Sequence, residues 1–151
     1  MGFQRPLIVT GRGVVAAGLI DQLVELNPQA AYPVFDATPA NPTEAATHEG
    51  VACFRDAECD GIIAVGGRAP IDLAKASAVS VCHPGPLKQF AVIEGGLTRI
   101  TAATVPIVAI PTTAGIGSEV GRGAIIILDD GRKVGILSPM SSRGWPSAIR
   151  C

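Results

Sequence analysis

The sequence predicts an α/β fold: a largely parallel sheet with flanking helices and a peripheral β-hairpin. Two stretches, residues 60–76 and 105–120, indicate the parallel sheet because each joins a short apolar run to a loop rich in small residues. Unbroken apolar runs of this kind are typical of parallel strands that are covered on both faces. Two later apolar runs around Asp130-Gly131 indicate the hairpin.

Strands and helices alternate along most of the predicted chain. Their order is strand 6–9, helix 10–26, strand 32–35, helix 41–57, strand 62–65, helix 70–82, irregular chain 84–104, strand 105–110, and hairpin strands 122–128 and 133–137. The first helix is indicated by apolar residues at helical spacing, namely Val15, Leu19, Leu23 and Leu26. Asn41 or Thr43 is the expected cap of the second helix.

Composition fits one domain of this class. The chain has 151 residues, of which 48% are hydrophobic and 4% aromatic, so the core must consist of Ala, Val, Ile and Leu. A chain of this length buries about two thirds of its unfolded surface. The formal net charge is −1 and no basic run occurs, which argues against nucleic acid or an anionic membrane as a partner.

Targeting signals and cysteine usage indicate a cytoplasmic protein. No apolar run approaches the ~20 residues of a membrane span, and the first residues lack the pattern of a signal peptide. The cysteines form no C-x-x-C pair and are expected to be reduced; they are Cys53, Cys59, Cys82 and Cys151. His48 and His83 have no partners at ligand spacing, so neither is predicted to bind a metal.

A glycine turn follows the central strand. Gly66 and Gly67 let the backbone turn sharply and approach a ligand closely, because no Cβ forbids positive φ. Pro70 suits the first position of a helix, and Asp72 then puts a carboxylate in its first turn. Unpaired N–H groups at such a helix start bind anions, typically phosphate. A Gly-Gly turn without a ligand is the alternative for this stretch alone.

Three motifs together resemble the nucleotide-binding domain of the iron-containing (group III) alcohol dehydrogenases. Residues 66–75 are similar to the family's Gly-Gly-Gly-Ser-Pro-x-Asp-x-x-Lys, and residues 111–119 to its Pro-Thr-Thr-Ala-Gly-Thr-Gly-Ser-Glu. Residues 36–43 are similar to its Asp-x-x-x-x-Asn-Pro-Thr. The resemblance covers about residues 6–139. It implies a Rossmann-like fold and NAD-dependent oxidation of small alcohols or reduction of aldehydes.

The resemblance also implies the cofactor site. Asp36, at the end of a strand, is expected to accept hydrogen bonds from a ribose hydroxyl and to favour NAD over NADP; a solvated loop aspartate is the alternative. Asp72 and Lys75 are expected to border the cleft, with a surface ion pair as the alternative. The implied contacts are Asp36, Asn41, Pro42, Thr43, Gly66, Gly67, Arg68, Ala69, Asp72, Lys75, Thr112, Thr113, Gly117 and Ser118, with Gly11 and Gly13 near the first turn.

The chain departs from the family at three of its motif positions. Arg68 and Ala69 replace the third glycine and the serine, which we expect to cost about 1 kcal/mol each, through backbone strain and a lost helix cap. Arg68 retains a charge for pyrophosphate, but its bulk lies where the backbone should meet the ligand. Ile116 replaces a threonine and removes a hydrogen-bond donor. We therefore expect weakened cofactor binding.

Residues 140–151 resemble nothing in the family, so the cofactor domain is expected to end at residue 139. When the tail is written in codons, several of them chosen freely, and the reading frame is moved back by one base, the family's Pro-x-x-Ala-Ile-x-Asp-Pro segment is restored. A frameshift after Pro139 is our hypothesis, and genomic sequencing across this point decides it. In the family, a helical domain absent from this sequence supplies an aspartate and three histidines to divalent iron or zinc.

Two alternatives to an enzyme half stay open at the level of sequence. The chain could be a non-catalytic nucleotide-binding module, or a non-functional fragment whose exposed apolar surface makes it associate into oligomers. Retained NAD binding without turnover would favour the first alternative. A homo-oligomer without a response to ligand would favour the second.

Overall fold

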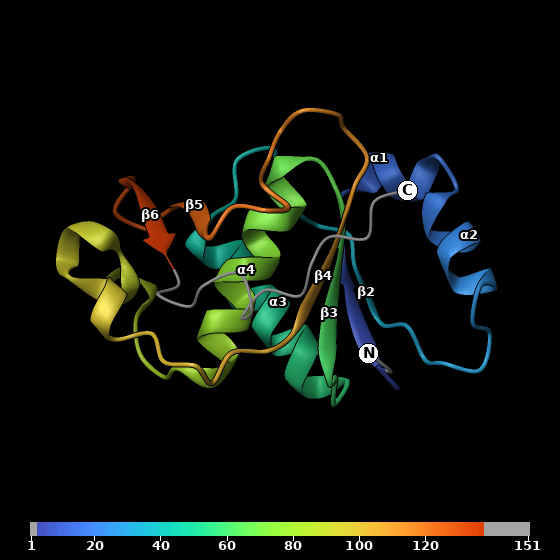
Figure 1. The fold of residues 1–151 in the computed structure, drawn as a ribbon, viewed down its shortest axis with the longest axis horizontal. Helices are drawn as coiled ribbons and strands as arrows, with labels where there is room; N and C mark the ends of the chain where they lie inside the picture. Colours follow the sequence, from blue (N-terminus) through green and yellow to red (C-terminus); the bar gives the residue numbers. More distant parts are fainter. Residues whose placement is uncertain (1–2, 138–151) are drawn as a thin grey trace.

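The computed structural model describes residues 3–137, and the predicted aberrant tail at 140–151 lies outside them. A four-stranded parallel sheet forms the centre of the molecule (Figure 1). Its strand order is β2-β1-β3-β4, with β1 at Pro6–Val9, β2 at Val34–Phe35, β3 at Gly61–Gly66 and β4 at Ile107–Pro111. The predicted α/β class and the parallel sheet are confirmed.

The strand order contains a reversal between β1 and β3. From β1 the chain moves outward to β2, then crosses back to β3 and continues to β4 on the other side. Helices α1 and α2 lie on one face of the sheet, and α3 and α4 on the other (Figure 1). In open α/β sheets of this topology, ligands bind beyond the carboxyl ends of the strands at the reversal.

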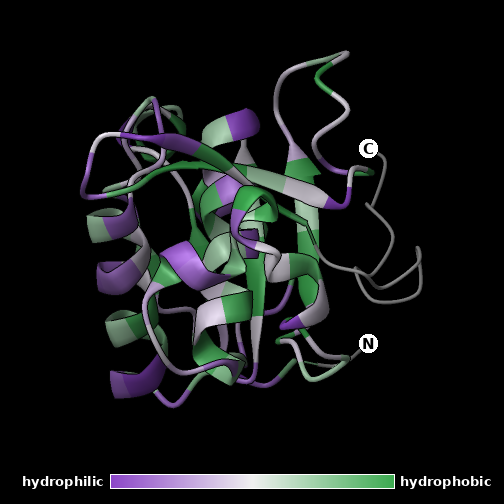
Figure 2. Cartoon of the chain, turned by 90° about the vertical axis from the view of Figure 1, so that its left-hand side faces the viewer, coloured by the Kyte–Doolittle hydropathy of each residue, from purple (hydrophilic) through white to green (hydrophobic). Residues whose placement is uncertain are grey.

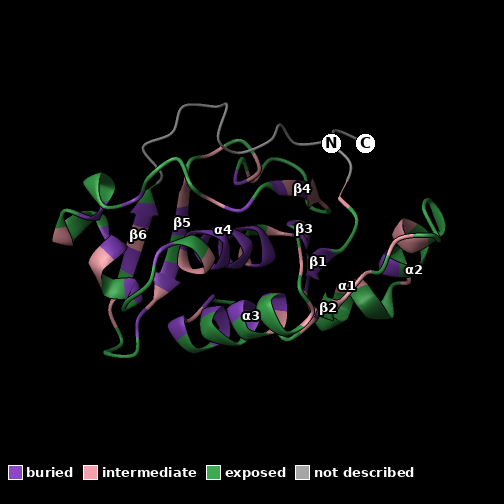
Figure 3. Ribbon diagram, turned by 90° about the horizontal axis from the view of Figure 1, so that it is seen from below, coloured by how far each residue is buried: buried purple, intermediate pink, exposed green. Residues whose placement is uncertain are grey.

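Helix α4, Arg68–Cys82, is exposed at its start, at Arg68, and is then buried from Pro70 to Val79 (Figure 3). One side packs on the sheet in a core cluster that includes Ile71 and Leu73. The other side packs against the hairpin in a second cluster that includes Ala76 and Val79. Residues 70–79 are all buried, so the charged side chains among them, Asp72 and Lys75, need internal partners.

The predicted single helix at 10–26 is two short helices, α1 at Arg12–Ala16 and α2 at Leu19–Glu25. Gly18 between them has a φ of 73°, a left-handed conformation that stops the first helix. The expected apolar face is also wrong in part, because Val15 and Leu26 are 38% and 81% exposed.

The next helix, α3, begins three residues after the predicted start, with Thr43, one of the two predicted caps, whereas α4 begins earlier than predicted. Helix α3 spans Glu44–Asp56, and Thr43 caps it through its Oγ1, which accepts a hydrogen bond of 3.1 Å from the Ala46 N–H. Helix α4 is preceded by Gly67 as its N-cap. Pro70 is therefore the third helical residue and Asp72 the fifth, so the prediction of Asp72 in the first turn is wrong.

The second half of the chain wraps α4. Three short 3₁₀ helices, η1 at Leu87–Phe90, η2 at Val92–Glu94 and η3 at Gly96–Thr98, occupy the segment predicted as irregular. The antiparallel hairpin of β5, Gly123–Ile127, and β6, Lys133–Leu137, is confirmed.

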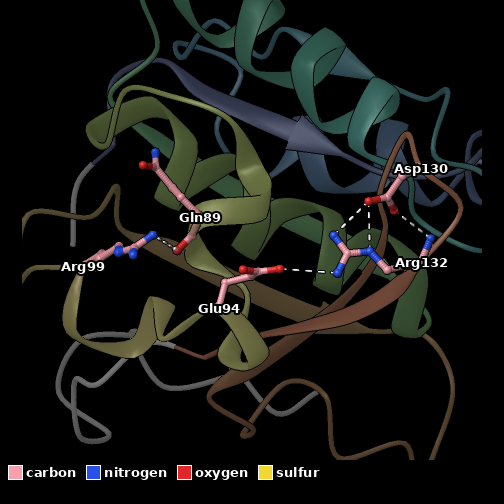
Figure 4. A network of polar contacts seen from close by, with 5 residues as sticks. All are labelled: Gln89, Glu94, Arg99, Asp130 and Arg132. Atoms are coloured by element: carbon pink, nitrogen blue, oxygen red, sulfur yellow. Dashed lines mark hydrogen bonds and ion pairs between the residues drawn. The ribbon is translucent and has the colours of Figure 1, made fainter.

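An arginine ties the hairpin turn to the 3₁₀ segment. The Arg132 Nε donates to Asp130 Oδ2 at 2.9 Å, and its Nη1 donates to Glu94 Oε1 at 3.3 Å (Figure 4). Arg132 thus holds the hairpin at its turn, while the second core cluster holds its apolar face.

Hydrophobic residues gather on the strands in the middle of the molecule (Figure 2). Within residues 3–137, no helix is both long enough and apolar enough to cross a lipid bilayer.

The cysteines should differ in reactivity. Burial, with smaller contributions from Cys53 and Asp60, raises the pKa of Cys59 to about 11. Burial also raises the pKa of Cys53, whereas Cys82 is exposed. Because the thiolate is the nucleophile, iodoacetamide at pH 8 should modify Cys82 well before Cys53 and Cys59, as followed by peptide mass spectrometry.

Raising the pH toward 11 should accelerate the labelling of Cys59 in the folded protein, because more of this thiol then ionises. Labelling in denaturant serves as the control, since all cysteines then react at similar rates. Equal rates for Cys59 and Cys82 in the folded protein would contradict the burial of Cys59.

Candidate cofactor site

The predicted motifs meet at the carboxyl edge of the sheet, around the reversal between β1 and β3. The loop after β4 lies against the glycine turn after β3, because the Thr112 N–H donates to the Gly66 carbonyl at 3.0 Å. The turn after β1 lies against the segment after β2 through a bridge between Gly11 and Ala37. Sequence motifs far apart in the chain thus form one edge.

The glycine turn has a geometry that only glycine supports at its first position. Gly66 has a φ of 143°, and a Cβ there would lie 2.8 Å from Pro70 Cγ. Gly67 is extended, and a Cβ there would lie 3.5 Å from Thr113 Oγ1. The missing Cβ at Gly66 therefore makes room for Pro70 of α4, and the missing Cβ at Gly67 leaves the backbone open toward Thr113 in the loop after β4.

The two substitutions in the turn cause no distortion of the backbone. Arg68 is the first residue of α4, and Glu58 is the non-glycine residue with positive φ among residues 3–137. The strain expected at Arg68 is therefore absent. Ala69 is the second helical residue, whereas the N-cap is Gly67. A serine at 69 would not occupy the cap position, so the predicted loss of a helix cap is wrong.

Asp72 holds the loop after β4 and the hairpin from inside the molecule. Its side chain is buried, with Oδ1 accepting from Ser118 Oγ at 2.6 Å and Oδ2 from the Ile125 N–H at 3.1 Å. The alternative of a surface ion pair is wrong for this residue. The Ser118 hydroxyl donates to the carboxylate, so its proton serves the loop and is not available to a ligand in this arrangement.

Lys75 completes this attachment one turn further along α4. Its Nζ donates to the carbonyls of Ser118, Gly121 and Gly123 at 2.5, 2.7 and 3.0 Å. An ammonium has three N–H donors, one for each of these carbonyls. Burial lowers the pKa of Lys75, and attraction to Asp72 and Glu119 opposes that change.

A hollow of about 120 Å³ lies between three segments of the chain. It brings together five of the predicted residues, Asn41, Pro42, Arg68, Ala69 and Asp72. The hairpin supplies the rest of its wall with Ile125, Ile127 and Lys133, and the segment before Asn41 contributes Ala40.

The sequence patterns did not predict that the hairpin residues Ile125, Ile127 and Lys133 line this hollow. Strand alternation puts Ile125 and Ile127 on one face of the hairpin, but no local signal says what that face meets. A long-range contact decides it: the Ile127 N–H donates to the Pro42 carbonyl at 2.8 Å. Lys133 Nζ lies 3.5 Å from Asn41 Oδ1, its hydrogen-bond acceptor.

A second hollow, of about 280 Å³, contains Asp36. Its other lining residues are Arg12, Ala37, Thr38 and Pro39. The Oγ1 of Thr38 is buried and has no hydrogen-bond partner within residues 3–137.

The remaining predicted residues lie around these hollows. Thr112, Thr113 and Gly117 are exposed in the loop after β4, whose turn uses a φ of 64° at Gly117. Thr43 uses its hydroxyl as the α3 cap. Gly13 lies in α1, and a Cβ there would meet open space.

Ile116 has a packing role. It is half-buried and packs against the main core cluster. The apolar side chain that replaces the family's threonine therefore anchors the loop from below, where a hydroxyl would need a partner.

A metal site does not fit the part of the chain that the structure describes. Among residues 3–137 no group of three or more His, Cys, Asp or Glu side chains could hold an ion. The Nε2 of His83 accepts from the Thr101 N–H at 2.9 Å, so its Nδ1–H donates to the Val79 carbonyl, also at 2.9 Å. His48 lies 3.7 Å from Glu44.

The sheet order and the loops at its carboxyl edge define the class of protein, a Rossmann-like α/β domain. The family model described as "Iron-containing alcohol dehydrogenase" matches residues 1–142. The chain belongs to the iron-containing alcohol dehydrogenase family, as its three motifs predicted.

Curated relatives and solved structures agree with this assignment. The chain is 53% identical over 138 residues to 4-hydroxybutyrate dehydrogenase of Cupriavidus necator, covering 91% of this chain and 36% of that protein. It is 35% identical over 130 residues to 1,3-propanediol dehydrogenase of Klebsiella pneumoniae, covering 83% of this chain and 33% of that one. The chain thus spans about a third of the length of these relatives.

A crystal structure of sulfoacetaldehyde reductase from Bifidobacterium kashiwanohense in complex with NAD⁺ has the same fold. The TM-score is 0.85 at 27% identity, over 98% of this chain and 38% of that one. A 1,3-propanediol oxidoreductase structure gives a TM-score of 0.84 at 34% identity, over 97% of this chain and 37% of that one.

Replacement of Lys75 tests the attachment of the loop. Lys75→Met should lower the free energy of unfolding by about 3–5 kcal/mol, because it leaves buried carbonyls and Asp72 without their cation. Urea unfolding followed by circular dichroism measures this loss.

Lys88→Met is the matched control, since Lys88 is exposed in η1 and its replacement should change the free energy by less than about 0.5 kcal/mol. An equally small loss for Lys75→Met would show that the three hydrogen bonds do not hold the loop.

Proposed function

We propose that this chain is the NAD-binding half of an alcohol dehydrogenase and that it binds NAD at the carboxyl edge of its sheet. One observation carries the proposal: the fold gathers three separated motifs at the reversal between β1 and β3, where α/β domains bind nucleotides. The NAD⁺ complex of the sulfoacetaldehyde reductase with the same fold supports it.

In this proposal the residues at the carboxyl edge of the sheet contact different parts of NAD. Asp36 receives the adenosine ribose hydroxyls, and the Gly66-Gly67 turn with the first turn of α4 receives the pyrophosphate. Asn41 and Pro42 line the adenosine end. Thr112 and Thr113 donate to the cofactor from the loop, and Gly117 lets that loop turn.

Asp72, Lys75 and Ser118 hold the loop in place from beneath. Their polar atoms are engaged with the loop and the hairpin, so they act on the cofactor through the position of Thr112 and Thr113. They are positioning residues.

Bound NAD supplies the hydride acceptor for oxidation of an alcohol, and NADH the donor for reduction of an aldehyde. The 53% identity to 4-hydroxybutyrate dehydrogenase makes short hydroxy acids the first substrate class to test in a protein that contains this domain. The chain alone should bind NAD without turnover, because residues 3–137 offer no ligand set for the metal of the family.

Calorimetry with NAD tests the cofactor site directly. The 151-residue chain should bind NAD, and the double variant Arg68→Gly, Ala69→Ser should bind several-fold more tightly. Removal of the bulky side chain opens the approach to the Gly66-Gly67 turn. A several-fold change corresponds to about 1 kcal/mol.

Arg99→Gly is the charge-matched control, because Arg99 directly follows η3 and donates to the Gln89 carbonyl, and the η1–η3 segment lies away from the turn between β3 and α4 (Figure 1). This variant should bind NAD as the parent chain does. Binding in neither the parent chain nor the double variant would overturn the proposal. Equal binding in both would leave the site standing and refute the role of Arg68.

A further inference from the structure

Arg12 shares the second hollow with Asp36 (lining residues Arg12, Asp36, Ala37, Thr38 and Pro39). The backbone places them together: the Thr10 N–H donates to the Phe35 carbonyl at 2.9 Å, and Gly11 forms its bridge with Ala37. Arg12 and Asp36 are the two charged residues of this lining. The end of β1 therefore presents a cation beside the acid at the end of β2.

Neither of these charged groups is paired with another protein group within residues 3–137. The guanidinium of Arg12 makes no hydrogen bond or ion pair there, and neither does the carboxylate of Asp36. Arg12 is exposed and Asp36 half-buried. The five donors of the guanidinium are thus available to a ligand that enters the hollow.

The chemistry of the two groups differs in what each selects. A carboxylate at the end of the second strand accepts hydrogen bonds from the ribose hydroxyls of NAD, whereas an arginine nearby accommodates the 2′-phosphate of NADP. The planar fork of a guanidinium matches phosphate oxygens in a bidentate manner. Both kinds of group line one hollow here.

We infer that Arg12 is a cofactor-specificity residue that binds the 2′-phosphate, so that the site accepts NADP in addition to NAD. This inference rests on the proposed cofactor site. Asp36 repels the added phosphate and keeps NAD the preferred ligand. Solvent screens both the repulsion and the attraction at this open edge, which keeps the two affinities within about tenfold of each other.

Calorimetry of three variants with NAD and with NADP tests the inference. Arg12→Ala should weaken NADP binding about tenfold, the loss of one charge-assisted contact, and should change the Kd of NAD by less than about twofold. Asp36→Asn should have the opposite effect on the preference between the two cofactors, because it should strengthen NADP binding and weaken NAD binding.

Arg99→Ala is the control. It removes the same charge from a residue that directly follows η3 and donates to the Gln89 carbonyl (Figure 4). The η1–η3 segment lies at the other end of the molecule from α1 (Figure 1). This variant should leave the Kd of both cofactors unchanged. Circular dichroism of each variant establishes that the fold is retained.

The outcomes separate this inference from the proposal on which it rests. Binding of NAD with no measurable binding of NADP would overturn the inference and leave the NAD site intact. An equal loss of both cofactors in Arg12→Ala would also overturn it, because the arginine would then serve a group common to both. Binding of neither cofactor by the parent chain would overturn both.

Discussion

Burial of two opposite charges on one helix is the constraint on which the rest of this structure depends. Asp72 and Lys75 lie one turn apart in a helix that the sheet covers on one side and the hairpin on the other. Neither charge can be buried without partners. The loop after β4 and the first strand of the hairpin supply those partners with a hydroxyl, an amide and three carbonyls.

The same constraint explains why the candidate site has its shape. The loop that carries Thr112 and Thr113 has few apolar residues, so its position comes from polar attachment to α4 and from Ile116 packed beneath it. The hairpin is held by α4 on one side and by the segment before α3 on the other. Its Ile125 and Ile127 therefore become a wall of the hollow beside the glycine turn.

Sequence patterns predicted those parts of the fold and site that depend on local chemistry. The four parallel strands, the hairpin, the Thr43 cap and the glycine turn follow from apolar runs and from residues with special backbone preferences. The break at Gly18 and the exposure of Val15 were missed, because apolar spacing does not reveal a change of helix direction. The engagement of Ser118 with Asp72 was missed because it joins residues 46 positions apart.

The attachment of Lys75 has a consequence for the order in which the chain assembles. The three carbonyls that accept from Lys75 follow it in the sequence by 43 to 48 residues. The Ile125 N–H, which donates to Asp72, follows Asp72 by 53 residues. Until those residues arrive, both side chains must stay hydrated, so α4 cannot be enclosed. Closure of these long loops and dehydration of the two charges form one cooperative event. A partly folded chain should thus keep the hairpin side of α4 open and hydrated until the loop and the hairpin close over it.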